Sequence, residues 1–146
     1  MTERVILLVE DSSSDEELTL RALKKNNIVN RVVVTRDGAE ALDYLFAQGT
    51  HSSRNPDEVP QVVLLDLNLP KISGLEVLRR IRADERTKLL PVVILTSSQE
   101  DKDLVGGYAS GANSYVVKPV DFTQFAEAVR QLGMYWLVVN QCAPRN

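Results

Sequence analysis

The sequence predicts an α/β fold built around a doubly wound, five-stranded parallel sheet. Three observations favour it: five short aliphatic runs, a segment with helical periodicity after each run, and apolar residues at every position of two central runs. Continuous apolar runs are typical of strands covered by helices on both faces. Strict alternation of strands and helices indicates parallel strands joined by right-handed crossovers. We expect the chain to form one domain over residues 1–146.

The expected strands are rich in β-branched and aliphatic residues. In chain order they cover residues 4–9, 31–35, 61–65, 91–95 and 114–117. The expected helices begin with capping pairs, in which Ser or Asp stands three residues before Glu or Gln. The pairs are Ser13/Glu16, Asp37/Glu40, Ser73/Glu76, Ser97/Glu100 and Asp121/Gln124. One such pair is weak support, but five at the right places favour the alternation.

Composition and charge narrow the classes of function. The net charge of −3 offers no basic surface, so nucleic-acid binding is not expected. No stretch approaches the roughly 20 apolar residues of a membrane span, and the first ten residues do not resemble a secretory signal. We therefore expect no membrane association and a cytoplasmic protein. With one cysteine, Cys142, and one histidine, His51, neither a zinc site nor an internal disulfide is expected.

One connection is longer than usual. Residues 48–60 form a polar stretch that contains Gly49, Pro56 and Pro60. A connection between a helix and a strand usually has about 2–6 residues. We interpret this loop as a surface insertion rather than a binding loop, and we expect His51 to be solvated.

Candidate functional residues follow the strands, because open parallel sheets bind ligands beyond the carboxyl ends of their strands, where the strand order reverses. Glu10 and Asp11 follow the first strand, Asp66 the third, Thr96 the fourth and Lys118 the fifth. With the strand order 2-1-3-4-5, the three carboxylates would share one cleft. They would stay ionised together only beside a cation, and their oxygen atoms suit Mg²⁺ or Mn²⁺.

Lys118 and the Thr96 hydroxyl would stand on the far side of that cleft, where they could hold an anion. A metal, a carboxylate nucleophile, an ammonium group and a hydroxyl group around one point are what phosphoryl transfer to a carboxylate requires.

The motifs at the strand ends resemble those of a known family. They are Val9-Glu10-Asp11, Leu65-Asp66-Leu67-Asn68-Leu69-Pro70 followed by Ser73-Gly74, Leu95-Thr96-Ser97, and Tyr115-Val116-Val117-Lys118-Pro119. In this order they are similar to the motifs of response-regulator receiver domains in two-component signalling, over residues 5 to about 133. The resemblance implies a flavodoxin-like receiver fold with strand order 2-1-3-4-5. It also implies that a sensor histidine kinase donates a phosphoryl group to the chain.

The resemblance further implies a role for each acidic residue. Asp66 would be the phosphoacceptor. Asp11 and Asp66 would bind Mg²⁺ through their side chains, and Asn68 through its backbone carbonyl. Glu10 stands where the family often has Asp, and it would act on the metal mostly through water.

Three other residues would respond to the phosphoryl group. Lys118 would pair with a phosphoryl oxygen, Thr96 would turn toward it, and Tyr115 would swing inward to fill the vacated space. The surface made by the fourth helix, the fifth strand and the fifth helix would then change shape.

Single residues also have ordinary structural explanations. Glu10 and Asp11 could cap the first helix, where its dipole favours carboxylates. Thr96 could be a capping hydroxyl, and Lys118 could be solvated. Asp66 resists such an explanation, because a carboxylate directly after four aliphatic residues is costly to bury without partners.

The end of the chain is unusually apolar. The expected last helix, about residues 121–139 before a short tail, carries an apolar stripe of Phe122, Phe125, Val129, Leu132, Trp136 and Val139. Tyr135 and Leu137 add apolar surface on other sides, which usually marks a contact. We predict a homodimer with Tyr135, Trp136 and Leu137 at its interface; alternatively, the helix folds back over its own domain. The Tyr-Trp-Leu ending and the long 48–60 loop are also similar to response regulators of bacterial and cyanobacterial phytochromes.

Two other classes of function remain open. Haloacid-dehalogenase phosphatases also use an aspartyl nucleophile with Mg²⁺, but they need a second Asp where this chain has Asn68, and they generally carry a cap domain. A phosphorylation-independent adaptor would have no need of Asp11, Asp66, Thr96 and Lys118 together. We therefore expect a switch that promotes only its own phosphorylation and dephosphorylation, rather than an enzyme.

Overall fold

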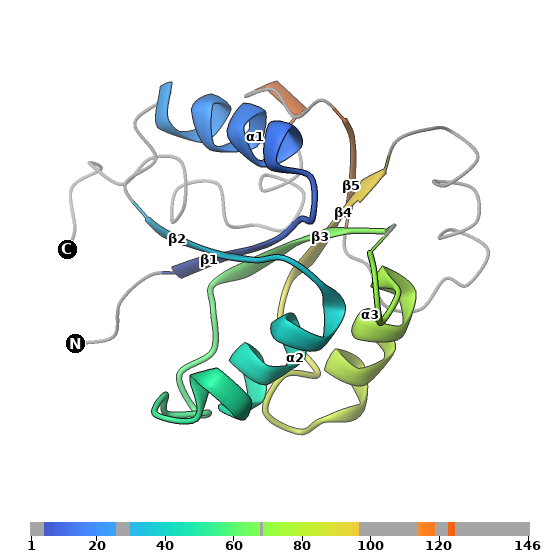
Figure 1. Cartoon of the computed structure of the whole chain (residues 1–146). Coiled ribbons are helices and arrows are strands. Elements are labelled where there is room, and N and C mark those ends of the chain that lie inside the picture. Colours follow the sequence, from blue (N-terminus) through green and yellow to red (C-terminus); the bar gives the residue numbers. More distant parts are fainter. Residues whose placement is uncertain (1–4, 26–29, 68, 97–113, 119–122, 125–146) are drawn as a thin grey trace, which may run out of the picture.

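A computed structural model describes residues 5–25, 30–67, 69–96, 114–118 and 123–124 (Figure 1). The elements are β1 (Val5–Val9), α1 (Ser13–Lys25), β2 (Arg31–Thr35), α2 (Gly38–Phe46), the 3₁₀ helix η1 (Gly49–His51), β3 (Val62–Asp66), α3 (Gly74–Ala83), β4 (Val92–Thr96) and β5 (Ser114–Val117). The strands form one parallel sheet in the order β2-β1-β3-β4-β5. The predicted fold class and strand order are confirmed, and each strand begins and ends within one residue of its expected place.

Some expectations concern residues outside this description. They include the capping pair Ser97/Glu100, Asp121 of the pair Asp121/Gln124, all of the final helix at about 121–139 except residues 123–124, and the apolar residues Tyr135, Trp136 and Leu137. Among the described ranges, no helix combines the length and the apolarity that crossing a membrane demands.

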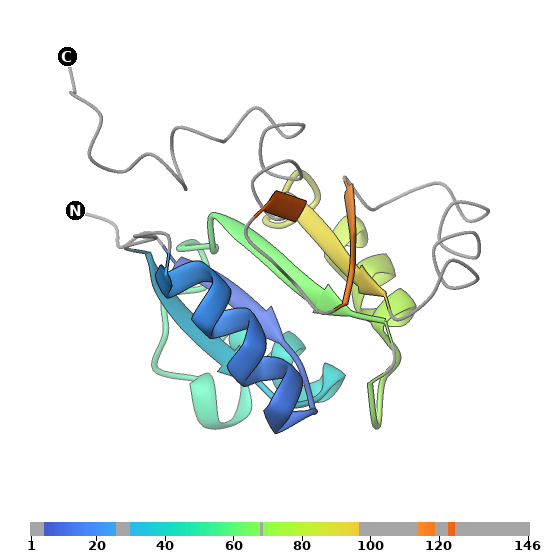
Figure 2. The same cartoon turned by 90° about the horizontal axis from the view of Figure 1, so that it is seen from above.

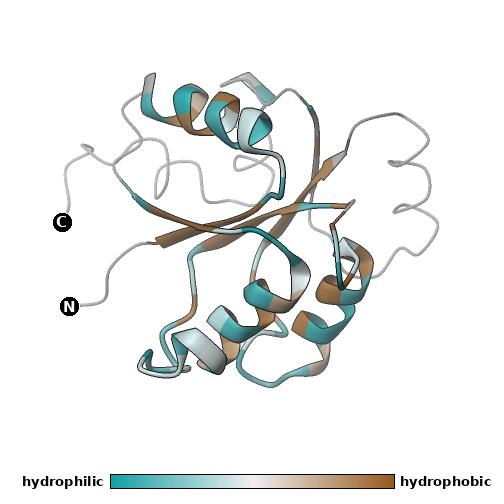
Figure 3. Cartoon of the chain, in the orientation of Figure 1, coloured by the Kyte–Doolittle hydropathy of each residue, from teal (hydrophilic) through white to brown (hydrophobic). Residues whose placement is uncertain are grey.

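Helices cover both faces of the sheet, α1 on one side and α2 with α3 on the other (Figures 1 and 2). Successive strand side chains point to opposite faces. Ile6 and Leu8 therefore pack in the cluster that includes Leu23 of α1, whereas Leu7 and Val9 pack in the cluster with α2 and α3. Both faces are apolar, and the strands are the most uniformly hydrophobic elements (Figure 3). This explains the unbroken aliphatic runs of the sequence.

Side-chain caps fix the helix starts. The Asp37 carboxylate accepts a hydrogen bond from the Glu40 backbone N–H at 2.8 Å, and the Ser73 hydroxyl accepts one from the Glu76 N–H at 3.2 Å, as the capping pairs predict. The predicted cap of the first helix is wrong by one residue: Ser12, not Ser13, accepts from the Asp15 N–H, at 3.2 Å. Residues 12–14 are all serine, so the sequence pattern alone cannot show which of them caps the helix.

The 48–60 loop is folded against α2. The Arg54 guanidinium lies 3.9 Å from the centre of the Tyr44 ring and donates to the backbone carbonyls of Tyr44 and Glu58. His51 packs edge-on against the same ring, at 5.2 Å between centroids, and its Nε2 lies 3.4 Å from the Glu40 carboxylate. His51 is therefore only partly solvated: its side chain is 24% exposed, because Tyr44 offers it an apolar surface.

The buried strands should carry most of the stability. Leu64 is fully buried in β3, whereas Leu89 in the α3–β4 connection is 87% exposed. We expect Leu64→Ala to lower the free energy of unfolding by about 2–5 kcal/mol, because it removes buried apolar contacts and leaves a cavity. The same change at Leu89 should cost less than about 0.5 kcal/mol. Urea unfolding of both variants measures this difference, and equal losses would contradict the assigned core.

Candidate functional site

The pleat of the strands sends three charged side chains to one side of the sheet. In β1, β3 and β5, the last strand residues that belong to the α1-facing cluster are Leu8, Leu64 and Val116. Glu10, Asp66 and Lys118 each come two residues later, so the alternation directs them to the same side, at the carboxyl ends of β1, β3 and β5. The switch point between β1 and β3 thus places Glu10 next to Asp66, as the strand order implies.

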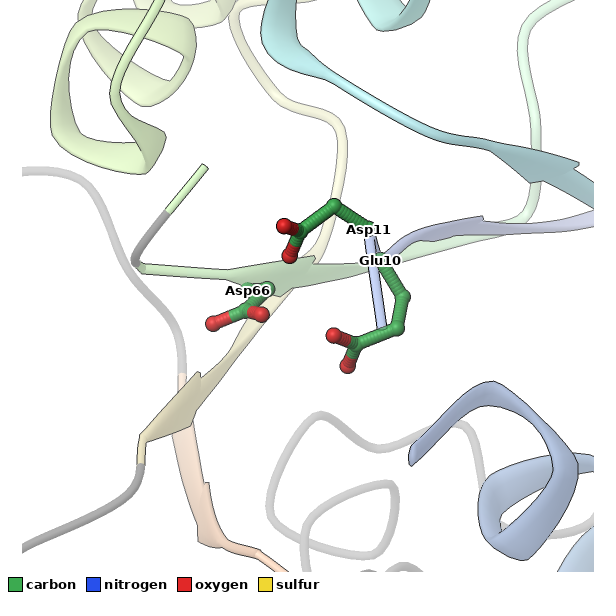
Figure 4. Close-up of side chains that lie close together, drawn as sticks. All are labelled: Glu10, Asp11 and Asp66. Carbon is green, nitrogen blue, oxygen red and sulfur yellow. The ribbon is translucent and has the colours of Figure 1, made fainter. Parts of the chain in front are cut away.

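Three carboxylates converge at this point. Glu10, Asp11 and Asp66 each offer an oxygen atom, and the three atoms lie within 4.8 Å of one another (Figure 4). Glu10 is fully buried and Asp66 is 3% exposed, whereas Asp11 faces solvent. Two carboxylates are therefore held by the fold, and the third lies at the mouth of the cleft.

The donor set fits a small divalent cation. Mg²⁺ takes oxygen ligands at about 2.0–2.1 Å, so two oxygens on opposite sides of one ion are about 4.2 Å apart. The spread of 4.8 Å exceeds this by less than one ångström, which side-chain rotation can supply. Asp11, which faces solvent, has the most freedom to adjust. Asp11 is exposed, so an ion can reach this carboxylate from solvent.

The Lys118 ammonium group lies among these carboxylates. Its Nζ is 3.1 Å from Asp66 Oδ2 and 3.4 Å from both Glu10 oxygens, and its side chain is 13% exposed. Its nearest partner is Asp15 Oδ2 of α1, at 2.9 Å. Burial lowers the pKa of Lys118, but the hydrogen bond to Asp15 and the charges of Asp66 and Glu10 outweigh burial and raise it above its ordinary value. The lysine is therefore held as a cation.

Asp15 is a site residue that sequence reasoning missed. The signal that could have found it is its spacing: it stands three residues after Ser12, in the first turn of the helix that follows β1. A carboxylate at that position is usually explained by the helix dipole. Only the observed position of the first turn of α1 at the carboxyl end of the sheet brings it to Lys118.

Glu10 is held in an unusual electrostatic state. Burial, followed by its contact with the Asp66 carboxylate, raises the pKa of Glu10 to about 8, while Lys118 and the Ser12 N–H act in the opposite direction. The Glu10 carboxylate accepts from the Ser12 backbone N–H at 3.3 Å. Glu10 therefore contacts the start of the first helix, as the helix-capping explanation predicts, and it also lies beside the other two carboxylates.

The remaining expected site residues are only partly described. Thr96 ends β4 and pairs with Val117, and Tyr115 pairs with Ile94, so their backbones lie in the sheet. Their side chains lie outside the described part of the structure, as does the whole of Asn68. Their roles in switching and in metal binding stay predictions.

Comparison with known proteins identifies the family. The family model described as "Response regulator receiver domain" matches residues 6–130. The chain therefore belongs to the receiver domains of response regulators, which are signalling proteins, and phosphorylation-dependent signalling fits its fold and its acidic cleft.

Individual relatives show which members of this family the chain is similar to in sequence and fold. The solved structure of the bacteriophytochrome response regulator AtBRR is 52% identical, with a TM-score of 0.88, and the match covers 96% of this chain and 99% of that one. The bacteriophytochrome response regulator RtBRR is 50% identical, with a TM-score of 0.88, and that match covers 98% of this chain and 86% of RtBRR. Response regulator Rcp1 of Synechocystis sp. is 37% identical over 134 residues, covering 92% of this chain and 89% of Rcp1. The Mn²⁺-bound form of Rcp1 superposes with a TM-score of 0.72 at 33% identity, and covers 98% of this chain and 99% of that one. The chain is thus similar to single-domain phytochrome response regulators.

A divalent cation should stabilise the protein, because it relieves the repulsion among the three carboxylates. At a Mg²⁺ concentration 100 times its dissociation constant, the expected gain is about 2.7 kcal/mol. Asp11→Asn should reduce the shift in melting temperature that Mg²⁺ causes, whereas Asp57→Asn, in the 48–60 loop, should leave it unchanged. Thermal unfolding with and without Mg²⁺ measures this, and an unchanged shift in Asp11→Asn would exclude Asp11 as a ligand.

Proposed function

We propose that the chain is a phosphorylation switch in which Asp66 accepts a phosphoryl group from a sensor histidine kinase. The observation that carries this proposal is the position of the buried Asp66 carboxylate, which lies at the end of β3 beside Glu10, Asp11 and Lys118. In the transfer, an Asp66 oxygen forms a bond to phosphorus as the bond from phosphorus to the kinase histidine nitrogen breaks. The histidine nitrogen then regains a proton from solvent.

Each charged residue that meets at the end of β3 has a part in this proposal. Asp11 and Asp66 would hold Mg²⁺, with Mn²⁺ as a substitute, and Glu10 would act mostly through water, as in the receiver domains that the chain resembles. The metal, when bound, supplies positive charge that offsets the carboxylates and the incoming phosphoryl oxygens. Lys118 is already within reach of Asp66 and would pair with a phosphoryl oxygen.

The rest of the switch is proposed from the sequence. The Asn68 carbonyl would complete the protein ligands of the metal. A phosphoryl group brings a charge of about −2, which would attract the Thr96 hydroxyl and Lys118, and Tyr115 would move into the vacated space. The fourth helix, β5 and the fifth helix would carry the resulting change to a partner.

The similarity to AtBRR, RtBRR and Rcp1 supports a phytochrome-type histidine kinase as the donor. We propose that the protein acts in the cytoplasm as one receiver domain over residues 1–146. It would promote its own phosphorylation and dephosphorylation only, and act through protein partners rather than through nucleic acid.

Replacement of the acceptor tests the proposal. Asp66→Asn should abolish acid-stable, hydroxylamine-sensitive labelling from a phosphorylated kinase or from acetyl phosphate, because an amide is not a nucleophile for this transfer. Asp57→Asn is the control, and it should be labelled to one phosphoryl group per chain like the parent. Labelling of Asp66→Asn at the parent rate would exclude the assignment. Continuous turnover of a simple phosphate ester by the parent would instead favour the phosphatase.

We also propose a homodimer through the fourth helix, β5 and the fifth helix. Its support is the apolar sequence of the final segment, in which Tyr135, Trp136 and Leu137 follow one another. The expected helix would carry apolar residues on several sides, which favours contact with a second copy of the chain.

A double variant tests the dimer. Leu137→Asp combined with Tyr135→Ala should lower the sedimenting mass to that of a monomer, because a charge in the centre of an interface is costly to bury. Labelling of Asp66 should persist, which shows that the domain still folds. A double variant that sediments like the parent would argue that the helix covers its own domain instead.

A further inference from the structure

The shortest ion pair of Lys118 does not involve the proposed phosphoacceptor. Its Nζ lies 2.9 Å from Asp15 Oδ2, compared with 3.1 Å from Asp66 and 3.4 Å from Glu10. An ammonium group has three N–H donors. Asp15 therefore takes the best placed of the donors that could otherwise serve the acidic cleft.

The start of α1 explains why Asp15 is free to do this. In a capping box, the acid at the third helical position bonds back to the N–H of the cap residue. Here that N–H, on Ser12, is taken by Glu10 Oε2 at 3.3 Å. Asp15 keeps its own backbone bond to the Ser12 hydroxyl, and its carboxylate is directed to Lys118 instead.

Partial burial strengthens the ion pair between Lys118 and Asp15. The Lys118 side chain is 13% exposed and that of Asp15 is 35% exposed, so solvent screens their interaction only in part. Burial lowers the pKa of Lys118, and the hydrogen bond to Asp15 raises it together with the charge of Asp66 and the hydrogen bond to it. At 2.9 Å from the ammonium nitrogen, the Asp15 carboxylate competes with any other anion for it.

We infer that Asp15 is a positioning residue that draws the Lys118 ammonium away from Asp66, and so favours the metal-bound, unphosphorylated state over the phosphorylated one. This inference rests on the proposed role of Asp66 as the phosphoacceptor. Without Asp15, Lys118 would pair more strongly with Asp66 and Glu10. It would then compete with a cation for those carboxylates, and be freer to bind a phosphoryl group.

The inference has a signature that structural damage would not produce. Loss of the Asp15 charge should weaken the binding of a cation and strengthen the binding of an anionic phosphoryl substitute, whereas a distorted site would weaken both. Asp15→Asn keeps the shape of the side chain. Glu17→Gln is the matched control, because it removes one charge from an exposed pair with Arg21 on the same helix.

Two titrations of the full chain test this. For Asp15→Asn we expect the dissociation constant for Mg²⁺ to rise about two- to fivefold, in line with a partly exposed ion pair. At saturating Mg²⁺, the dissociation constant for beryllium fluoride should fall by a similar factor. Glu17→Gln should change neither constant, and in a Lys118→Ala background Asp15→Asn should have no further effect.

The outcomes separate the two proposals. The role of Asp15 would be overturned if Asp15→Asn shifted the dissociation constants for Mg²⁺ and beryllium fluoride in the same direction, or changed neither. It would also be overturned if the effect persisted in the Lys118→Ala background. If the parent is neither labelled at Asp66 nor binds beryllium fluoride, the phosphorylation switch fails. The Mg²⁺ titration in the two backgrounds then decides alone whether Asp15 acts through Lys118.

Discussion

The structure depends on the balance of charge at the carboxyl end of the sheet. Lys118 pairs with three carboxylates, those of Glu10, Asp15 and Asp66, and Asp11 brings a fourth close to Glu10 and Asp66. Carboxylates at this density repel one another, and burial removes the water that would weaken the repulsion. One lysine offsets only part of the charge. The cleft is therefore suited to a second cation. In the proposed function, that cation would offset the charges of the carboxylates and of the phosphoryl group.

The rest of the domain holds this unfavourable cluster in place. β1 and β3 are buried along their whole length, are paired to each other, and contribute to the apolar clusters on both faces of the sheet. Gly74 starts α3 against the end of β3, where its N–H donates to the Leu67 carbonyl at 3.1 Å and a Cβ would lie 2.8 Å from the Leu67 Cα. The backbone just after Asp66 is thus fixed by close packing. A local conflict of charge supported by a well-packed core is typical of functional sites.

The fold could be predicted from the sequence because its signals are local and repeated. Aliphatic runs mark every strand, and caps such as Asp37 mark helix starts. The meeting of Asp66 with Glu10 also followed, because strand order and register bring the strand ends together. Asp15 and His51 could not be placed in this way. Their surroundings depend on how a helix lies over the sheet and how a loop folds on Tyr44, and neither leaves a periodic pattern in the sequence.

Glu10 shows how one side chain links the site to the helix above it. A glutamate is one methylene longer than an aspartate, and here its carboxylate reaches the Ser12 N–H while it remains beside Asp66 and Lys118. Since Ser12 also caps the turn that carries Asp15, the start of α1 and the cleft share their hydrogen-bond partners. Any change of charge at Asp66 must alter the distribution of the Lys118 protons between Asp15 and the cleft. The first turn of α1 is therefore part of the electrostatics of the site, although it lies outside the strand-end motifs that identify the family.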